Sequence, residues 1–223
     1  MNFDWPEEFE QYLDELLKWN KMFNLTSITD REEAKFRHFY DSLSLREAFD
    51  FSGSKLSIID IGSGAGFPGL PMKIIFPNIY LTLLDATAKK IKFLEHIIVL
   101  LKLEGAEAVW SRAEDYARKK TEQYDAAFCR ALAPLNIAVE LCLPFVKKGG
   151  RVFAMKGKDI GSELSESENA LKILGGRVER IVVPRVPDGK NGYLDRSIVV
   201  IEKIHNIPPG YPRKAGFPKK RPL

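Results

Sequence analysis

The stretch "DIGSGAGFPGLP", residues 60–71, decides the fold class. It begins inside the apolar run "LSIIDI" at 56–61 and leads into "PGLPMKIIF" at 68–76, which predicts a buried strand, a glycine-rich turn and a helix. In open α/β sheets, a glycine-rich turn at such a junction binds a nucleotide. The stretch therefore predicts a nucleotide-type cofactor site at the carboxyl end of the first strand.

Strand and helix patterns continue to alternate after this stretch. Further strands are predicted at 79–86, 106–112, 124–131, 149–157, 177–184 and 196–203, and helices at 68–76, 89–103, 134–146 and 162–174. This alternation favours a parallel sheet covered on both faces, whereas the last two strands have no helix between them and should run antiparallel. The sequence predicts an α/β, Rossmann-like fold of the class I methyltransferase type, with seven strands, mostly parallel, and one antiparallel strand.

We expect residues 1–223 to form a single methyltransferase domain with three parts. Residues 1–50 form an N-terminal helical extension, 51–204 the Rossmann-like core, and 205–223 a basic, proline-rich tail. A helix is predicted from residue 5 to 23, and Asp30 with Glu33 resembles a capping box that starts a second helix. The tail has five prolines, so we expect it to be extended and only partly ordered.

The glycine spacing narrows the choice of cofactor. The dinucleotide fingerprint is G-x-G-x-x-G, but here Gly62, Gly64 and Gly66 alternate and position 67 is Phe, so an NAD-dependent oxidoreductase is disfavoured. No G-K-[ST] follows, which excludes a P-loop. Pro68 and Pro71 remove backbone donors from the start of the helix, where a pyrophosphate would bind. S-adenosylmethionine carries no phosphate and suits this loop.

The ends of the second and third predicted strands supply further cofactor candidates. Asp85 follows Gly62 by 23 residues, which is the position of an acid that accepts hydrogen bonds from ribose hydroxyls. Ala113 offers a backbone N–H and Glu114 a carboxylate to an adenine edge. The structural alternatives are a helix cap for Asp85 and a first-turn acid for Glu114.

Composition excludes several classes of protein. The two cysteines, Cys129 and Cys142, have no metal-type spacing, so we expect neither a metal site nor a disulfide framework, and a reducing cytoplasm fits. No apolar run is long enough to span a membrane, and the acidic N-terminus does not resemble a signal peptide. We expect no membrane association and a monomer.

The net charge of +4 is unevenly distributed. Residues 1–50 contain six Lys/Arg against twelve Asp/Glu, whereas 205–223 contain five Lys/Arg and no acid. An acid-free basic tail is typical of proteins with a polyanionic partner, and a merely solvated tail is the alternative.

The chain resembles the RsmG (GidB) family of bacterial small-subunit rRNA methyltransferases. The matching segments, in order, are "NLTSITD", "HFYDSL", "DIGSGAGFPGLP", "LLDATAKKIKFL", "SRAEDY", "CRALAPL", "FAMKGK" and "YPRKAGFPKKRPL". The resemblance implies methylation of N7 of a guanine in the 530 loop of 16S rRNA (position 527 in rRNA numbering), on naked rRNA or the small ribosomal subunit. It also implies cofactor contacts at Gly62, Phe67, Ala113, Glu114 and Arg130.

The chemistry of guanine N7 fits the residues that the sequence offers. N7 has a lone pair and no proton, so direct attack on the sulfonium methyl needs alignment rather than a general base. Arg130, after the fourth strand, is predicted to position the cofactor carboxylate or an RNA phosphate. Cys129 is expected to be a buried strand thiol, and His38 is left open between a structural role and contact with cofactor or RNA.

The RNA surface is expected around the same strand ends. Phe67 or Tyr193 could stack on an unstacked target base. The cationic candidates are Lys156, Lys158, Arg185, Lys190, Arg196, Arg213, Lys214, Lys219, Lys220 and Arg221. Two other functions stay open at this point, a methyltransferase for a small molecule or protein and a non-catalytic RNA-binding module.

Overall fold

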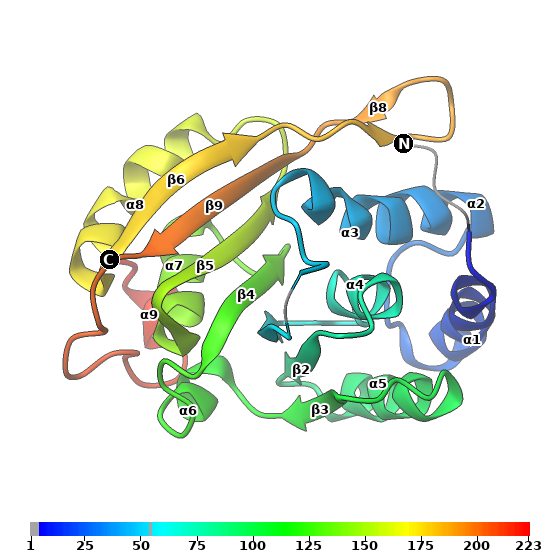
Figure 1. The fold of residues 1–223 in the computed structure, drawn as a ribbon, viewed down its shortest axis with the longest axis horizontal. Coiled ribbons are helices and arrows are strands. Elements are labelled where there is room, and N and C mark those ends of the chain that lie inside the picture. Colours follow the sequence, from blue (N-terminus) through cyan, green and yellow to red (C-terminus); the bar gives the residue numbers. More distant parts are fainter. Residues whose placement is uncertain (1–4, 54) are drawn as a thin grey trace.

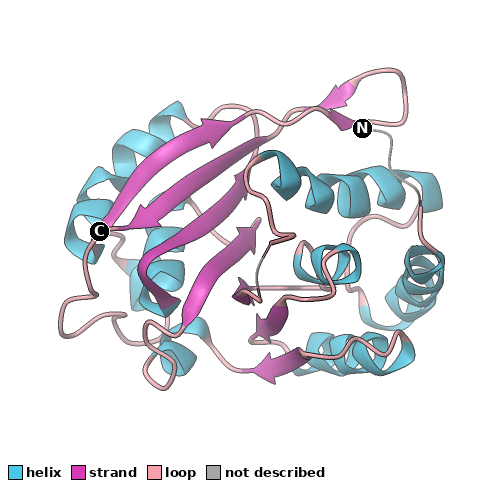
Figure 2. Ribbon diagram, viewed as in Figure 1, coloured by secondary structure: helices cyan, strands magenta, loops and turns pink. Residues whose placement is uncertain are grey.

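The computed structural model describes residues 5–53 and 55–223, which form a mixed sheet with helices on both faces (Figures 1 and 2). The main sheet has the order β3-β2-β1-β4-β5-β9-β6. Its strands are β1 (Ser57–Ile61), β2 (Tyr80–Asp85), β3 (Ala106–Trp110), β4 (Tyr124–Arg130), β5 (Val146–Lys156), β6 (Gly176–Val182) and β9 (Ser197–Lys203).

Strand directions confirm the predicted topology. Strands β1 to β5 pair in parallel, while β9 lies between β5 and β6 and is antiparallel to both. The sheet is therefore the seven-stranded, mostly parallel one with a single reversed strand. Because the order changes direction beside β1, the carboxyl ends of β1 and β4 form the switch point where ligands bind in such sheets.

The two faces of the sheet carry separate hydrophobic cores, because successive side chains along a strand point to opposite faces. Ile58 and Phe128 belong to the core shared with the N-terminal extension, whereas Ile59 and Ala127 belong to the opposite core. On the first face lie α1 (Glu7–Phe23), α3 (Asp41–Leu43), α4 (Gly69–Ile75) and α5 (Ala88–Leu100). On the second lie α6 (Ala113–Ala117), α7 (Leu135–Cys142) and α8 (Gly161–Leu174).

The N-terminal extension is helical, as the sequence predicts. After α1, a continuous helical segment comprises α2 (Arg31–Ala34), the π-helical turn η1 (Lys35–Tyr40), α3 and the 3₁₀ turn η2 (Ser44–Glu47). Asp30 caps it, since its Oδ1 accepts the Glu33 N–H at 2.8 Å. Phe9 and Phe39 of this extension are fully buried against the sheet, so the extension shares the core of the methyltransferase fold.

Two regions differ from the sequence predictions. The segment between the predicted strands at 177–184 and 196–203 contains a two-stranded pair, β7 (Val186–Pro187) and β8 (Tyr193–Leu194), which are too short to show an alternating pattern. The tail is not simply extended, because α9 (Phe217–Lys220) packs against α7 and Pro218 is buried. In the described part of the chain, no helix has the length and apolar character needed to cross a bilayer.

Candidate cofactor and substrate site

The glycine spacing of the 60–71 loop follows from the packing beneath it. Gly66 has φ +95°, and a Cβ there would lie 2.5 Å from both the Tyr12 hydroxyl and Leu70. Tyr12 belongs to α1, is fully buried, and donates its hydroxyl hydrogen bond to the Ala65 carbonyl. The third glycine therefore arrives early because the N-terminal extension reaches under the loop, leaving no room for a side chain.

Most backbone donors of this loop are used within the protein. Gly62 N and Ser63 N donate to the Leu84 carbonyl, while Gly66 N and Phe67 N donate to the Ser63 carbonyl. At the start of α4, Gly69 N donates to Asp60 Oδ2 and Leu70 N to the Gly66 carbonyl. A pyrophosphate would need such N–H groups free, so the loop favours a cofactor without phosphate, as the two prolines predict.

Asp60 supports the loop from below. It is fully buried, Oδ2 accepts the Gly69 N–H at 2.9 Å, and Oδ1 has no hydrogen-bond partner within the described residues. Burial raises the pKa of this carboxyl from 3.8 to about 7, although the bond from Gly69 and the charge of Arg130 oppose the shift. Asp60 is therefore a structural acid, and it does not line either cavity described below.

Asp60 predicts a specific pH dependence of stability. Because the folded-state pKa is raised, folding retains a proton that the unfolded chain releases above pH 3.8, so stability falls as pH rises from 3.8 to about 7 and is constant above. Between pH 6 and pH 8, the free energy of unfolding of wild type, measured in urea, should fall by roughly 1 kcal/mol relative to that of Asp60→Asn. The exposed Asp115→Asn should track wild type, and a pH-independent difference for Asp60→Asn would contradict the assignment.

The first cavity, of about 370 Å³, lies at the carboxyl ends of β1, β2 and β3. Its walls include the apolar side chains of Ile61, Leu84 and Ile137, and polar residues also line it. The predicted cofactor residues that line it are Gly62, Asp85, Ala113 and Glu114. Gly64 contributes indirectly, since its N–H donates to Asp85 Oδ2 at 3.0 Å.

The polar residues that line this cavity fit an adenosine group. Asp85 is 6% exposed, and Oδ1 accepts the Thr87 N–H at 2.8 Å, which holds the carboxylate at the start of α5. Each carboxylate oxygen has a further lone pair for a ribose hydroxyl, so the structural and cofactor roles of Asp85 are compatible. Ala113 is the first residue of α6, so its N–H has no partner inside that helix. The donors and acceptors around this cavity therefore fit S-adenosylmethionine.

The C-terminal tail forms one wall of the first cavity. Gly216 N donates to Glu114 Oε1 at 2.7 Å, and Gly216 and Lys219 line the cavity. Arg213 is bound to Glu140, which is fully buried, with Nε donating to Oε1 at 2.7 Å. In this structure Arg213 anchors the tail through an ion pair with Glu140, and contact of Arg213 with RNA stays a prediction.

Removing the Arg213 side chain should release the tail. Arg213→Ala leaves Glu140 buried without its cation, and we expect the free energy of unfolding to fall by about 2 kcal/mol. Urea unfolding measures this loss, and limited proteolysis should cut the tail faster. Lys214→Ala, at an exposed neighbouring position, is the control and should change neither. Unchanged stability of Arg213→Ala would show that the ion pair with Glu140 does not anchor the tail.

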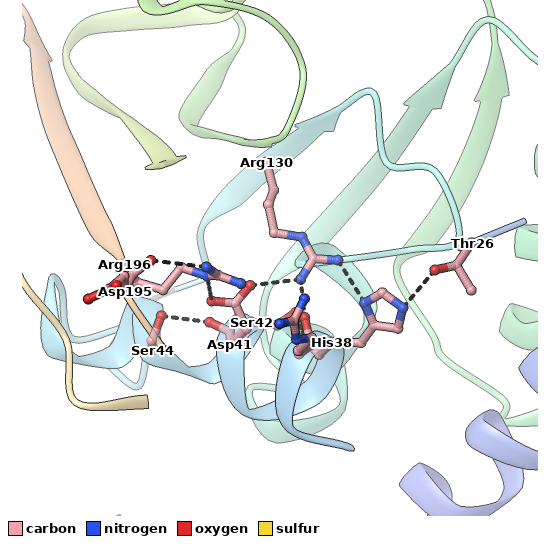
Figure 3. Close-up of polar contacts among 9 residues, drawn as sticks. Thr26, His38, Asp41, Ser42, Ser44, Arg130, Asp195 and Arg196 are labelled. Carbon is pink, nitrogen blue, oxygen red and sulfur yellow. Dashed lines mark hydrogen bonds and ion pairs between the residues drawn. The ribbon is translucent and has the colours of Figure 1, made fainter. Parts of the chain in front are cut away.

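A second cavity, of about 540 Å³, adjoins the first at Ala133 and Pro134. Arg130 lies in its wall at the end of β4, where NH1 donates to Asp41 Oδ2 at 3.0 Å (Figure 3). The same NH1 also donates to the Arg37 carbonyl at 3.0 Å. Arg196 Nε donates to the other oxygen, Asp41 Oδ1, at 2.8 Å (Figure 3). Two guanidinium groups thus share one carboxylate that is nearly inaccessible, leaving a net positive charge at this wall.

His38 is held in this network as a neutral ring. It is 7% exposed, Nε2 lies 2.9 Å from Thr26 Oγ1, and Arg130 NH2 donates toward Nδ1 at 3.3 Å (Figure 3). Burial, followed by the charge of Arg130, lowers the pKa of His38 to about 3. His38 contacts Arg130 and is not a protonated imidazolium near neutral pH.

Phe67 lies outside both cavities. It is 4% exposed and stacks on Tyr12 at 5.1 Å and on His38 at 4.6 Å, with the Arg130 guanidinium over its ring. The Phe67 ring is packed into the aromatic cluster of the N-terminal extension, which leaves little of it exposed for stacking on a base, and contact of Phe67 with the cofactor stays a prediction. Tyr193 is 62% exposed and keeps a free face.

The remaining RNA candidates fall into two groups. Lys156 and Arg196 line the second cavity and are ion-paired, to Glu163 and Asp41. Exposed cations lie at Lys158, Arg185, Lys190, Lys214, Lys219, Lys220 and Arg221. Cys129 and Cys142 are free, buried thiols, and the described residues contain no cluster of three His, Cys, Asp or Glu arranged to hold a metal ion.

Sequence reasoning missed Asp41 and Glu163. Asp41 lies within "HFYDSL", where a polar residue in an amphipathic helix reads as solvent-facing. Glu163 lies in the acidic first turns of α8 among other glutamates and serines. Both meet their partners only through tertiary contacts, 89 residues away for Asp41 and Arg130.

Comparisons with known proteins agree with this geometry. The family described as "GidB: rRNA small subunit methyltransferase G" matches residues 6–189. Ribosomal RNA small subunit methyltransferase G of Bacillus subtilis is 43% identical over 219 residues, covering 97% of this chain and 90% of the relative. The corresponding protein of Alkaliphilus metalliredigens is 44% identical over 214 residues, covering 95% and 88%.

Solved structures show the same fold at low identity. MtNAS in complex with MTA and tNA has a TM-score of 0.61 at 13% identity, covering 89% of this chain and 71% of that one. M. jannaschii TYW2 in complex with AdoMet has a TM-score of 0.58 at 14% identity, covering 77% and 80%. These likenesses bear on the fold, which is the Rossmann-like methyltransferase fold. With its family match and its close relatives, the chain belongs to the rRNA small subunit methyltransferase G family.

Proposed function

We propose that this chain transfers the methyl group of S-adenosylmethionine to N7 of a guanine in the 530 loop of 16S rRNA. Family membership and the names of the relatives support rRNA of the small subunit as the substrate. The fold supports S-adenosylmethionine as the methyl donor, and so does the glycine loop, most of whose backbone N–H groups are engaged within the protein and not free to bind a phosphate.

The observation that carries the proposal is the junction of the two cavities at Ala133 and Pro134. Methyl transfer needs the acceptor atom about 3–3.5 Å from the methyl carbon, so donor and acceptor must occupy adjoining sites. The first cavity suits the adenosine group, and the second opens beside it under a cationic wall. A base that enters the second cavity can therefore approach the cofactor directly.

The residues of this chain have positioning roles in the proposed reaction. When bound, S-adenosylmethionine supplies an electrophilic methyl on a sulfonium. Guanine N7 has a lone pair and loses no proton, so the protein needs no general base, which agrees with the neutral, hydrogen-bonded His38. Asp85 holds the ribose, while Arg130 and Arg196 keep N–H groups beyond those given to Asp41 for an RNA phosphate.

The RNA surface surrounds the mouth of the second cavity in this proposal. Lys158, Arg185 and Lys190 are exposed on the segments that follow β5 and β6. The tail adds Lys214, Lys219, Lys220 and Arg221 beside the first cavity. Such phosphate contacts give binding that weakens steeply with salt. Action as a monomer in the cytoplasm stays a prediction.

An assay with the purified chain tests the proposal. The chain is incubated with S-adenosylmethionine labelled in the methyl group and with small ribosomal subunits or 16S rRNA that lack the modification. Digestion to nucleosides should yield the label as 7-methylguanosine. Label in ribosomal protein, or in another nucleoside, would refute the proposed acceptor, and no label in RNA under either condition would refute RNA methylation.

A further inference from the structure

The second cavity contains a cation–carboxylate pair that none of the roles above uses. Lys156, at the end of β5, donates from Nζ to the Ala133 carbonyl and to Glu163 Oε2, both at 2.6 Å. Glu163 Oε2 also accepts the Leu135 N–H at 2.7 Å. Lys156, Glu163 and Ala133 all line the cavity, and Ala133 lines the cofactor cavity as well.

The hydrogen bonds hold both side chains in place but leave one donor of Lys156 and one oxygen of Glu163 without a partner among the described residues. Glu163 is held through Oε2, and among the described residues Oε1 has no hydrogen-bond partner. Lys156 has three N–H donors and two protein acceptors, so one donor is left. Lys156 is 11% exposed and Glu163 31%, so both are within reach of a ligand in the cavity while shielded from bulk solvent. The wall therefore presents one carboxylate acceptor beside one ammonium donor.

This arrangement matches one base. The Watson–Crick edge of guanine carries two adjacent donors, N1–H and the N2 amino group, next to the O6 acceptor. The free Oε1 of Glu163 has two lone pairs and can accept from these two adjacent donors, while the free N–H of Lys156 donates to O6. Adenine and cytosine present a ring nitrogen lone pair to the carboxylate, and uracil lacks the amino group beside its ring N–H. Since N7 lies on the other side of O6 from N1, a guanine held by this edge keeps N7 free.

We propose that the second cavity receives the unstacked target guanine and that Glu163 and Lys156 select it by its Watson–Crick edge. This inference rests on the proposed function, because it takes guanine N7 as the methyl acceptor. Enzymes that modify a base read the extruded base by this edge, and at about 540 Å³ the cavity falls in the range of small-ligand sites. Glu163 is then a specificity-determining residue that contacts substrate.

The test uses Glu163→Gln, which keeps the size of the side chain. Its amide oxygen can still accept from Leu135 N and Lys156, but its amide nitrogen meets the guanine donors with another donor. Glu166→Gln, an exposed position on the same helix with the same charge change, is the matched control. Both variants and wild type are assayed on 16S rRNA with guanosine or inosine at the target position, as naked RNA and assembled into small subunits. Inosine lacks only the N2 amino group.

Wild type should form 7-methylguanosine and prefer guanosine over inosine by about tenfold or more. For Glu163→Gln, kcat/KM on the guanosine RNA should fall by about 30-fold or more, and the preference over inosine should nearly disappear. Its affinity for S-adenosylmethionine should be unchanged and its thermal unfolding should stay cooperative, and Glu166→Gln should match wild type. Wild-type rates in Glu163→Gln, or an equal loss on both RNAs, would overturn the inference alone. Methylation of another base by wild type would overturn the proposed function with it.

Discussion

Replacing Arg130 with alanine should lower the rate of methyl transfer by about 100-fold or more and leave cooperative unfolding intact. Arg130 joins the end of β4 to the N-terminal extension through Asp41, the Arg37 carbonyl and His38, all at the wall of the second cavity. Its loss removes a cation from the second cavity and removes the hydrogen bonds that hold β4 to the N-terminal extension at this wall. The fold should survive because Asp41 keeps its bond from Arg196.

Single-turnover rates on small ribosomal subunits, with thermal unfolding beside them, measure this prediction. Arg177→Ala is the control, because Arg177 is an exposed arginine on β6 that pairs with Glu202 away from both cavities. Loss of cooperative melting in Arg130→Ala would instead show that Arg130 serves the fold. A near wild-type rate would remove Arg130 from the site altogether.

Asp85→Ala should weaken S-adenosylmethionine binding by more than about tenfold, as measured by calorimetric titration. The carboxylate is the acceptor at the rim of the first cavity, and it also fixes the loop through Gly64 N. Both losses act on the cofactor and neither acts on RNA directly. Glu95→Ala, an exposed acid on α5, should bind the cofactor as wild type does.

A cofactor analogue whose ribose lacks the 2′- and 3′-hydroxyls separates the two contributions of Asp85. Wild type should bind this analogue more weakly than the natural cofactor. Asp85→Ala should bind both with nearly equal affinity, because the acceptor for the hydroxyls is already gone. If the variant still discriminates between them to the same extent as wild type, Asp85 holds the loop and does not contact the ribose.

The sheet could be predicted from the sequence because its determinants are local. The apolar segments alternate with amphipathic ones, and the missing helix between 177–184 and 196–203 marks the reversed strand. Gly62, Asp85, Ala113 and Glu114 could be placed for the same reason, since each follows a strand of the parallel sheet and those ends meet at one edge. The two prolines of the glycine loop also predicted that few backbone donors would be free to bind a phosphate, and the hydrogen bonds of the loop agree with this.

The wall of the second cavity around Asp41 could not be predicted, because its polar contacts join residues far apart in the chain. Asp41 and Arg130 are 89 residues apart, and nothing in "HFYDSL" marks the aspartate as their meeting point. The packing of Phe67 and the ion pair of Arg213 could not be predicted for a related reason. An aromatic ring beside glycines suggests contact with a ligand, and so does an arginine in a basic tail. In the structure the ring stacks on Tyr12 and the arginine pairs with Glu140. Whether a cation or a ring is available to RNA can be judged only when its partners within the protein are known.

A mass map of 16S rRNA from cells that lack this protein tests the proposed methylation. The guanine of the 530 loop should lose its N7 methyl group in these cells, wild type should restore it, and Arg130→Ala should not. Other methylated positions in the same rRNA serve as internal controls and should be unchanged. Full 7-methylguanosine in the 530 loop without the protein, or loss of a methyl group elsewhere instead, would contradict the proposed methylation.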